Sequence, residues 1–291
     1  MSNQKEIENA ITEATGEKAK IVDFRSASGG CINNSRIISL KDGRQYFVKS
    51  SPGGAHYPGM FAAEYNGLNL MAATNTIRVP GPVAYNNDYL ILEVFTECSQ
   101  SAEWLERLGR QLAELHLATR QSQFGFETDN YIGSTQQPNT WTDNWLAFWR
   151  DQRIGWQLEL LSNKLSADDP IFNLGDRLLA KMDEMLGNLD EPAVLLHGDL
   201  WSGNAAAIDK GEPIIFDPAS YYGHREAELG IMRMFGGFGP RCEDAYHEVW
   251  PWDKGKEERI PLYRLYHELN HLNLFGRSYY QGCIDTMNQL L

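Results

Sequence analysis

Residues 195–204 of the chain read LLHGDLWSGN, and residues 214–226 read IIFDPASYYGHRE. An apolar, β-prone run precedes Asp199 in the first segment and Asp217 in the second. A strand that ends in a carboxylate places that carboxylate at the edge of a sheet, where a site can form. Asn204 lies between the two acids in the sequence, so the three side chains together predict a site that combines a base with a metal ion.

Size and composition restrict the class of protein. With 291 residues, 42% of them apolar, the chain can bury a full core and divide into two lobes. A net charge of −13 argues against a nucleic-acid-binding surface. The sequence lacks signal-peptide features, an apolar run of the roughly 20 residues that a membrane span needs, and metal-like cysteine spacing. We expect a soluble cytoplasmic protein, a monomer or weak homodimer, that contacts neither nucleic acid nor membrane.

The first fifty residues predict an antiparallel meander with strands at 20–24, 36–40 and 45–49. Its first connection is rich in glycine and small polar residues, and the candidate nucleotide-binding residues there are Gly29, Gly30, Cys31, Ile32 and Asn33. Glycines allow backbone amides to converge on an anion, so this loop is a candidate phosphate cradle. An ordinary hairpin turn is the alternative, because the strict GxGxxG pattern is absent.

A lysine and a glutamate follow in the order that an ATP site needs. Lys49 ends the third strand, and Glu64 lies beside the apolar face of a helix predicted at 60–73. A pair between them would hold the lysine at the α- and β-phosphates of ATP. The alternative for Lys49 is a solvated charge at the edge of a sheet.

The chain changes character once, from strands to helices near residue 96. A strand at 89–95 precedes the change, and the backbone of Glu93, Val94 and Phe95 would offer hydrogen-bonding groups to adenine; burial without a ligand is the alternative. Helices are then predicted over residues 101–116, 141–154, 170–187, 224–235 and 260–275. The change predicts a nucleotide-binding lobe of residues 1–95 and a catalytic and substrate lobe of residues 96–291.

The spacing of the acidic segments suits phosphoryl transfer, which needs a held triphosphate, a bridging cation and a base at the acceptor hydroxyl. Asp199 can accept the hydroxyl proton, while Asn204 and Asp217 offer oxygen ligands of the kind that Mg²⁺ prefers. His197 can orient the Asp199 loop by hydrogen bonding to the backbone. ATP and Mg²⁺ are therefore the expected cofactors.

The HGDLWSGN segment followed by FDPASYYGHREAELG resembles the fructosamine/ketosamine kinase family, a branch of the protein-kinase-like fold that also holds aminoglycoside and choline kinases. SGGCINNS, FVK, LILE and WLAFWRDQR fall in the family's order along the whole chain. The resemblance implies an α+β, two-lobed protein-kinase-like fold. The small N-terminal lobe would be an antiparallel sheet, and the larger C-terminal lobe would be mainly helical.

The resemblance also implies roles. Asp199 would be the catalytic base, Asn204 and Asp217 the Mg²⁺ ligands, and Trp201 would lie by the sugar part of the acceptor, with His197 also on the substrate side. The implied activity is ATP-dependent phosphorylation of the third-carbon hydroxyl of a ketosamine, free or on a protein, as a deglycation repair reaction. The alternatives are an aminoglycoside, amino-alcohol or sugar kinase of the same fold, and a nucleotide-binding pseudokinase module.

Three positions depart from related patterns. Gly198 replaces the arginine of the protein-kinase HRD motif, which disfavours a peptide kinase gated by an activation loop. Glu228 and Gly230 replace residues of the family's usual HREADLA, a change expected to loosen the start of the following helix without altering the catalytic assignment.

Cys31, in a loop of convergent amides, is a candidate oxidisable thiol, and the alternative is a small loop filler.

Overall fold

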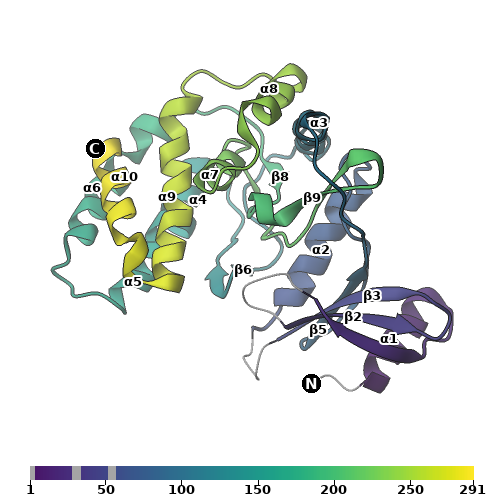
Figure 1. Cartoon of the computed structure of the whole chain (residues 1–291). Helices are drawn as coiled ribbons and strands as arrows, with labels where there is room; N and C mark the ends of the chain where they lie inside the picture. Colours follow the sequence, from purple (N-terminus) through teal and green to yellow (C-terminus); the bar gives the residue numbers. More distant parts are fainter. Residues whose placement is uncertain (1–3, 28–33, 52–56) are drawn as a thin grey trace.

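The computed structural model describes residues 4–27, 34–51 and 57–291, and the predicted phosphate cradle at Gly29 to Asn33 lies outside the described residues (Figure 1). The N-terminal sheet has five antiparallel strands in the order β1-β2-β3-β5-β4. Their bounds are Ile21–Ser26 (β1), Asn34–Leu40 (β2), Gln45–Ser50 (β3), Pro82–Tyr85 (β4) and Tyr89–Glu93 (β5).

The alternation of side chains along β3 decides where Lys49 points. Tyr46 and Val48 pack in a core formed with the helix α1 (Gln4–Thr15). Phe47 packs instead against the larger core of the molecule, on the opposite face of the sheet. Because successive side chains of a strand point to opposite faces, Lys49 shares the face of Phe47, away from α1.

The helix α2 (Met60–Ala73) lies between the sheet and the remainder of the chain (Figure 1). A Cβ atom at Gly67 would lie 2.6 Å from the hydroxyl of Ser220, so α2 approaches the segment after Asp217 closely. Phe61 and Leu68 belong to the same continuous core as the C-terminal helices. This contact brings Glu64, on α2, to the Asp217 segment.

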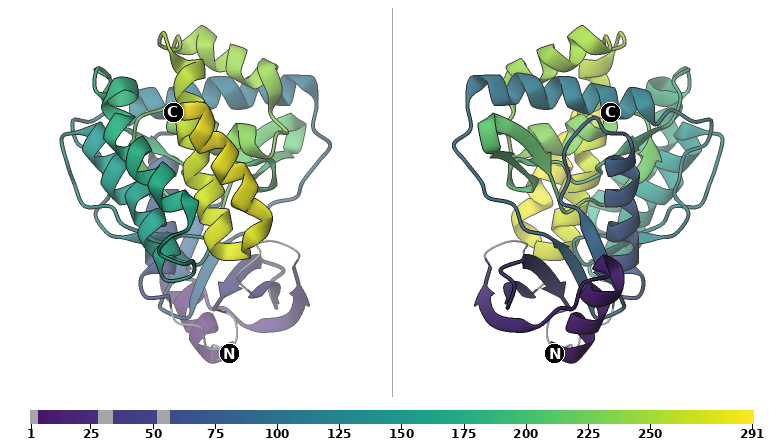
Figure 2. Two further views of the ribbon diagram at one scale, coloured as in Figure 1. Left: turned by 90° about the vertical axis from the view of Figure 1, so that its left-hand side faces the viewer. Right: turned by 90° about the vertical axis from the view of Figure 1, so that its right-hand side faces the viewer.

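The C-terminal part is mainly helical, with short two-stranded sheets set among the helices (Figures 1 and 2). Its α-helices are α3 (Ala102–Ala118), α4 (Trp145–Trp149), α5 (Trp156–Ser162), α6 (Pro170–Leu186), α7 (Ala227–Met234), α8 (Gly239–Val249), α9 (Lys256–Phe275) and α10 (Tyr280–Leu290), and a π-helical turn (Arg150–Gly155) joins α4 to α5. The strand pairs are β6 (Asn130–Ile132) with β7 (Thr135–Gln137), β8 (Val194–Leu196) with β11 (Tyr221–Gly223), and β9 (Ala205–Ile208) with β10 (Glu212–Ile215). None of the helices in the described part of the chain is long and apolar enough to cross a membrane.

The antiparallel sheet and the helical remainder agree with the predicted fold class, but several element boundaries differ from the prediction. The helix expected at 260–275 begins earlier, at Lys256, and the strand expected at 89–95 ends at Glu93. The helix expected at 224–235 begins at Ala227, because the residues before it pair as β11 and then turn. The helix expected from residue 141 begins at Trp145, where the side chain of Asn144 accepts a hydrogen bond from the N–H of Ala147. The helices α5, α8 and α10 were not predicted; α8 begins at Gly239, at the end of a short glycine-rich segment that follows α7.

Candidate active site

Lys49 joins three elements that are distant in the sequence. Its Nζ atom lies 2.6 Å from Oε1 of Glu64 on α2 and 2.6 Å from Oδ1 of Asp217, which follows β10. Lys49 and Glu64 are buried. Burial raises the pKa of Glu64 to about 7, although the neighbouring Lys49 ammonium opposes that shift. Lys49 and Glu64 therefore pair, as expected from the sequence, and the pair is connected to the second acidic segment.

The turn at Gly198 carries Asp199. Gly198 has a φ of 81°, and a Cβ atom there would lie 2.2 Å from the carbonyl oxygen of Ala219. A side chain at position 198 is therefore disfavoured by the positive φ and excluded by the close contact with the Ala219 carbonyl. The N–H of Ala219 donates to the carbonyl of His197 at 2.9 Å, which joins this turn to the segment after Asp217.

The imidazole of His197 connects the two acidic segments through their backbones. Its Nε2 donates to the carbonyl of Phe216 at 3.0 Å, and its Nδ1 accepts from the N–H of Asp199 at 3.3 Å. Burial lowers the pKa of His197, which favours the neutral ring that these two bonds require. His197 thus contacts the backbone on both sides of the site.

Glu228, on α7, accepts hydrogen bonds from the backbone of the same turn. Its Oε2 accepts from the N–H of His197 at 2.7 Å, and its Oε1 accepts from the N–H of Gly198 at 3.1 Å. The side chain is buried. α7 starts at Ala227 with Glu228 in its first turn, and Gly230 lies against α9, where a Cβ atom would lie 2.7 Å from the backbone of Tyr263.

Asn204 lies between the two acids in space as well as in sequence. Its Nδ2 donates to the carbonyl of Asp199 at 2.8 Å and to Oδ2 of Asp199 at 3.3 Å. Burial, together with the nearby charges of Asp217 and Glu228, raises the pKa of Asp199 well above its usual value. A carboxylate with a raised pKa is a stronger base than an ordinary aspartate.

Asp217 has a φ of 62°, a backbone conformation that non-glycine residues adopt rarely and often at functional sites. Among the described residues there is no group of three His, Cys, Asp or Glu side chains that could hold a metal ion. One carboxylate from Asp217 and one amide oxygen from Asn204 nevertheless suit Mg²⁺. This ion takes oxygen ligands, and phosphate oxygens and water commonly complete its coordination shell.

The segment expected to contact adenine connects the two parts of the molecule. The N–H of Glu93 already donates to the carbonyl of Gly81 at 2.8 Å, and its carboxylate pairs with Arg78. The ring of Phe95 lies 5.3 Å from that of Phe216, the residue before Asp217. The chain continues through Val94 and Phe95 to α3 without a strand or helix.

Trp201 is held in place by a glycine on one side and a phenylalanine on the other. A Cβ atom at Gly203 would lie 2.2 Å from the Trp201 ring, so the indole occupies the space that any other residue at 203 would need. The ring of Phe235, just after α7, lies 5.7 Å from the indole. Trp201 therefore has a defined position two residues after Asp199.

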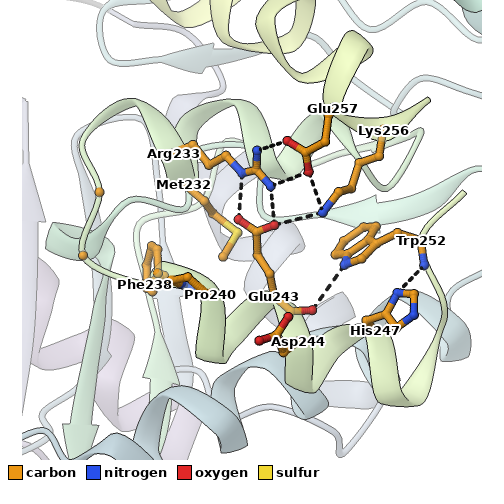
Figure 3. Close-up of a pocket in the computed structure, with 13 residues that line it drawn as sticks. Met232, Arg233, Phe238, Pro240, Glu243, Asp244, His247, Trp252, Lys256 and Glu257 are labelled. Carbon is orange, nitrogen blue, oxygen red and sulfur yellow. Dashed lines mark hydrogen bonds and ion pairs between the residues drawn. The ribbon is translucent and has the colours of Figure 1, made fainter. Parts of the chain in front are cut away.

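A separate cavity of about 770 Å³ lies between α7, α8 and the start of α9 (Figure 3). Arg233 pairs there with both Glu243 and Glu257, and Lys256 bonds Glu243 at 3.0 Å. The charged groups thus neutralise one another across three helices. Neither Asp199 nor the other predicted catalytic and metal-binding residues line this cavity.

Three residues that lie at the site in the structure are not among the predicted site residues. In the sequence, Glu228 stands out only as a departure from a family pattern. Phe216 is the last residue of the apolar run before Asp217, and Phe235 is the last residue of the helix predicted at 224–235. The sequence contains a signal for Phe216, because it directly precedes Asp217. Glu228 and Phe235 reach the site through the packing of α7 and its C-terminal end, and no local pattern marks them.

Solved structures first define the class. A choline kinase of Streptococcus pneumoniae superposes with a TM-score of 0.66 at 13% identity, covering 98% of this chain and 99% of that one, which shows a shared protein-kinase-like fold. A fructosamine-3-kinase candidate from Thermobifida fusca superposes with a TM-score of 0.88 at 32% identity over 99% of both chains.

Sequence comparison then gives the family. The family model for fructosamine kinase matches residues 3–291. A probable ketoamine kinase of Synechocystis is 42% identical over 98% of this chain and 96% of its own length. A protein-ribulosamine 3-kinase of Oryza sativa subsp. japonica is 43% identical over 95% of this chain and 81% of its own length. The chain therefore belongs to the fructosamine kinase family and is a phosphotransferase.

Proposed function

We propose that the protein transfers the γ-phosphoryl group of ATP to the third-carbon hydroxyl of a ketosamine, of the ribulosamine or fructosamine type. The observation that carries this proposal is the convergence of Lys49, Glu64, Asp199, Asn204 and Asp217 on one site in a chain of the fructosamine kinase family. Relatives are named as a protein-ribulosamine 3-kinase and, in mouse, a ketosamine-3-kinase.

In the proposed reaction, Asp199 accepts the proton of the acceptor hydroxyl, whose oxygen then bonds the γ-phosphorus as ADP leaves. His197 and Glu228 both hold the backbone of the Asp199 turn, so the base is positioned before the substrate binds. The raised pKa of Asp199 favours proton uptake by this carboxylate.

Lys49, held by Glu64, would contact the α- and β-phosphates once ATP is bound. Asn204 and Asp217 would hold Mg²⁺, which supplies positive charge between the phosphate oxygens. The backbone of Val94 and Phe95, with that of Glu93, would contact adenine, and Gly29 to Asn33 would cover the phosphates. In this scheme residues 1–95 form the nucleotide-binding lobe and residues 96–291 the catalytic and substrate lobe.

Phosphorylation at the third carbon makes the sugar adduct unstable and frees the amine, so the proposed biological role is deglycation. The reaction needs ATP, and Cys98, Cys242 and Cys283 are free thiols in the described part of the chain. Both features suit the cytoplasm as the proposed compartment.

The test is a substrate panel with Mg²⁺ and ATP. A ribulosamine, a fructosamine and kanamycin are compared for ADP release, and NMR then locates the phosphate on the product. We expect phosphate on the third carbon of the ketosamines and no transfer to kanamycin. Transfer to kanamycin alone, or phosphate at another carbon, would contradict the proposal.

A further inference from the structure

A row of aromatic side chains extends from Trp201 across the surface of the C-terminal part. Ring centroids lie 5.7 Å apart for Trp201 and Phe235, 5.1 Å for Phe235 and His271, 5.4 Å for His271 and Phe275, and 5.0 Å for His271 and Tyr279. All of these separations suit stacked or edge-on ring contacts. We call these five residues the aromatic strip.

The outer part of the aromatic strip is open to solvent. Phe235 is 44% exposed and Phe275 is 54% exposed, and both rings contact the ring of His271. A contiguous exposed apolar patch of this kind often marks a ligand-binding site. Phe275 ends α9, and Figures 1 and 2 place that end of α9 toward the N-terminal sheet. The aromatic strip therefore runs from the catalytic turn to the side of the molecule that faces the sheet.

The chemistry of the aromatic strip suits an amine with an apolar substituent. Nδ1 of His271 donates to the carbonyl of His267 at 2.7 Å, which leaves Nε2 as an acceptor in the neutral ring. Burial lowers the pKa of His271, so the neutral ring is favoured. The aromatic strip thus offers ring faces, which attract ammonium groups, and contributes no positive charge of its own.

The proposed substrate has a matching shape, and the following inference rests on the proposed function. In a ketosamine, the nitrogen lies only a few bonds from the third-carbon hydroxyl. With that hydroxyl at Asp199, the amine and its substituent extend from the neighbourhood of Trp201. We propose that Phe235 and Phe275 form a subsite for the amine-derived part of the acceptor, and that this subsite favours ketosamines whose amine carries an aromatic ring over those of small aliphatic amines.

The test compares two acceptors that share one sugar, the benzylamine adduct and the methylamine adduct. For the wild-type protein we expect kcat/KM to be about threefold to tenfold higher for the benzylamine adduct, the range expected for one ring contact. Phe275→Ala should reduce this ratio to near one, and Phe275→Tyr, which keeps a ring, should retain it. Phe24→Ala, at an exposed phenylalanine of β1, is the matched control and should leave the ratio unchanged.

Each other outcome has a defined meaning. A wild-type ratio near one, or a ratio that Phe275→Ala leaves intact, would overturn the subsite while transfer to both adducts supports the proposed function. An equal loss of the ratio in Phe24→Ala would also overturn the subsite, because the effect would not be local. Transfer to neither adduct would overturn the proposed function and the subsite with it.

Discussion

The Nζ atom of Lys49 lies 2.6 Å from Oδ1 of Asp217, a residue 168 positions later in the chain. The same ammonium bonds Glu64, so one cation neutralises two carboxylates that belong to different parts of the fold. Asp217 is also the proposed carboxylate ligand of Mg²⁺. In the proposed reaction, binding of Mg²⁺ and ATP would redistribute this ion pair, and the lysine would turn to the phosphates.

Lys49→Met should lose turnover by at least about 10² and also lose stability. Removal of one partner of a buried ion pair costs about 3 kcal/mol or more when the remaining charge stays buried. Glu64 can avoid that cost by taking up a proton, and its pKa is already raised by burial. The loss of unfolding free energy relative to wild type should therefore be larger at pH 8 than at pH 6, as measured by urea denaturation.

Lys41→Met, in the exposed turn after β2, is the matched control for that experiment. It should match wild type in turnover and in stability at both pH values. An equal loss at pH 6 and pH 8 in Lys49→Met would contradict the role assigned to Glu64.

Asp199→Asn should retain binding of ATP while turnover falls by roughly 10² or more, the scale of losing a general base. The amide keeps the shape of the side chain but cannot accept the hydroxyl proton. Nucleotide binding is measured by titration and turnover by ADP release. Asp209→Asn, at an exposed residue after β9, is the control and should match wild type in turnover. Turnover near the wild-type value in Asp199→Asn would exclude Asp199 as the base.

Glu228→Gln should lower kcat by about tenfold with little change in ATP affinity. The glutamine offers one acceptor oxygen where the glutamate offers two, so the N–H of His197 or Gly198 loses its partner, which costs about 1–3 kcal/mol for a buried group. Because Glu228 acts through the Asp199 turn, the loss should appear in kcat and not in nucleotide binding. Glu258→Gln, on the exposed side of α9, is the control. Equal effects of Glu228→Gln on kcat and on ATP affinity would indicate a general loss of structure and contradict the role of Glu228.

Gly203→Ala should raise KM for the ketosamine more than it changes binding of ATP. The added methyl group would enter the space of the Trp201 ring, 2.2 Å from one of its atoms, so the indole must move. Gly282→Ala is the control, because a Cβ atom there, in α10, has no heavy atom within 4 Å. Unchanged KM for the ketosamine in Gly203→Ala would show that the position of Trp201 does not affect acceptor binding.

His267→Gln should reduce the acid sensitivity of the fold. Burial lowers the pKa of His267 to about 3, while the unfolded chain takes up the same proton near pH 6.5. Between these values the unfolded state binds more protons, so wild-type stability falls with decreasing pH by up to about 1.4 kcal/mol per pH unit from this group. The free energy of unfolding should fall less in the variant between pH 6.5 and pH 5, and parallel curves would contradict this origin.

Much of the site could be predicted from sequence because its parts are local. Asp199 and Asn204 lie five positions apart, and Asp217 follows a strand of its own, so their convergence needs only a short turn and a hairpin. The pairing of Lys49 with Glu64 also follows from a strand and the next helix. The start of α7 could not be placed in this way. Residues 221–223 pair with β8, and the turn that follows is held by ion pairs of Arg225 with Glu191 and of Glu226 with Arg259, which no local pattern reveals.

The sequence by itself determined the fold class, the family and the central acids, because strand ends, glycine turns and the HGDLWSGN segment are local patterns with direct structural meaning. Only the tertiary structure decided that Glu228 supports the Asp199 turn, that Lys49 reaches Asp217, and that Phe235 continues the line of rings from Trp201. These contacts join segments that are far apart along the chain. They depend on how helices pack, and packing is set by the summed burial of many side chains rather than by any one motif.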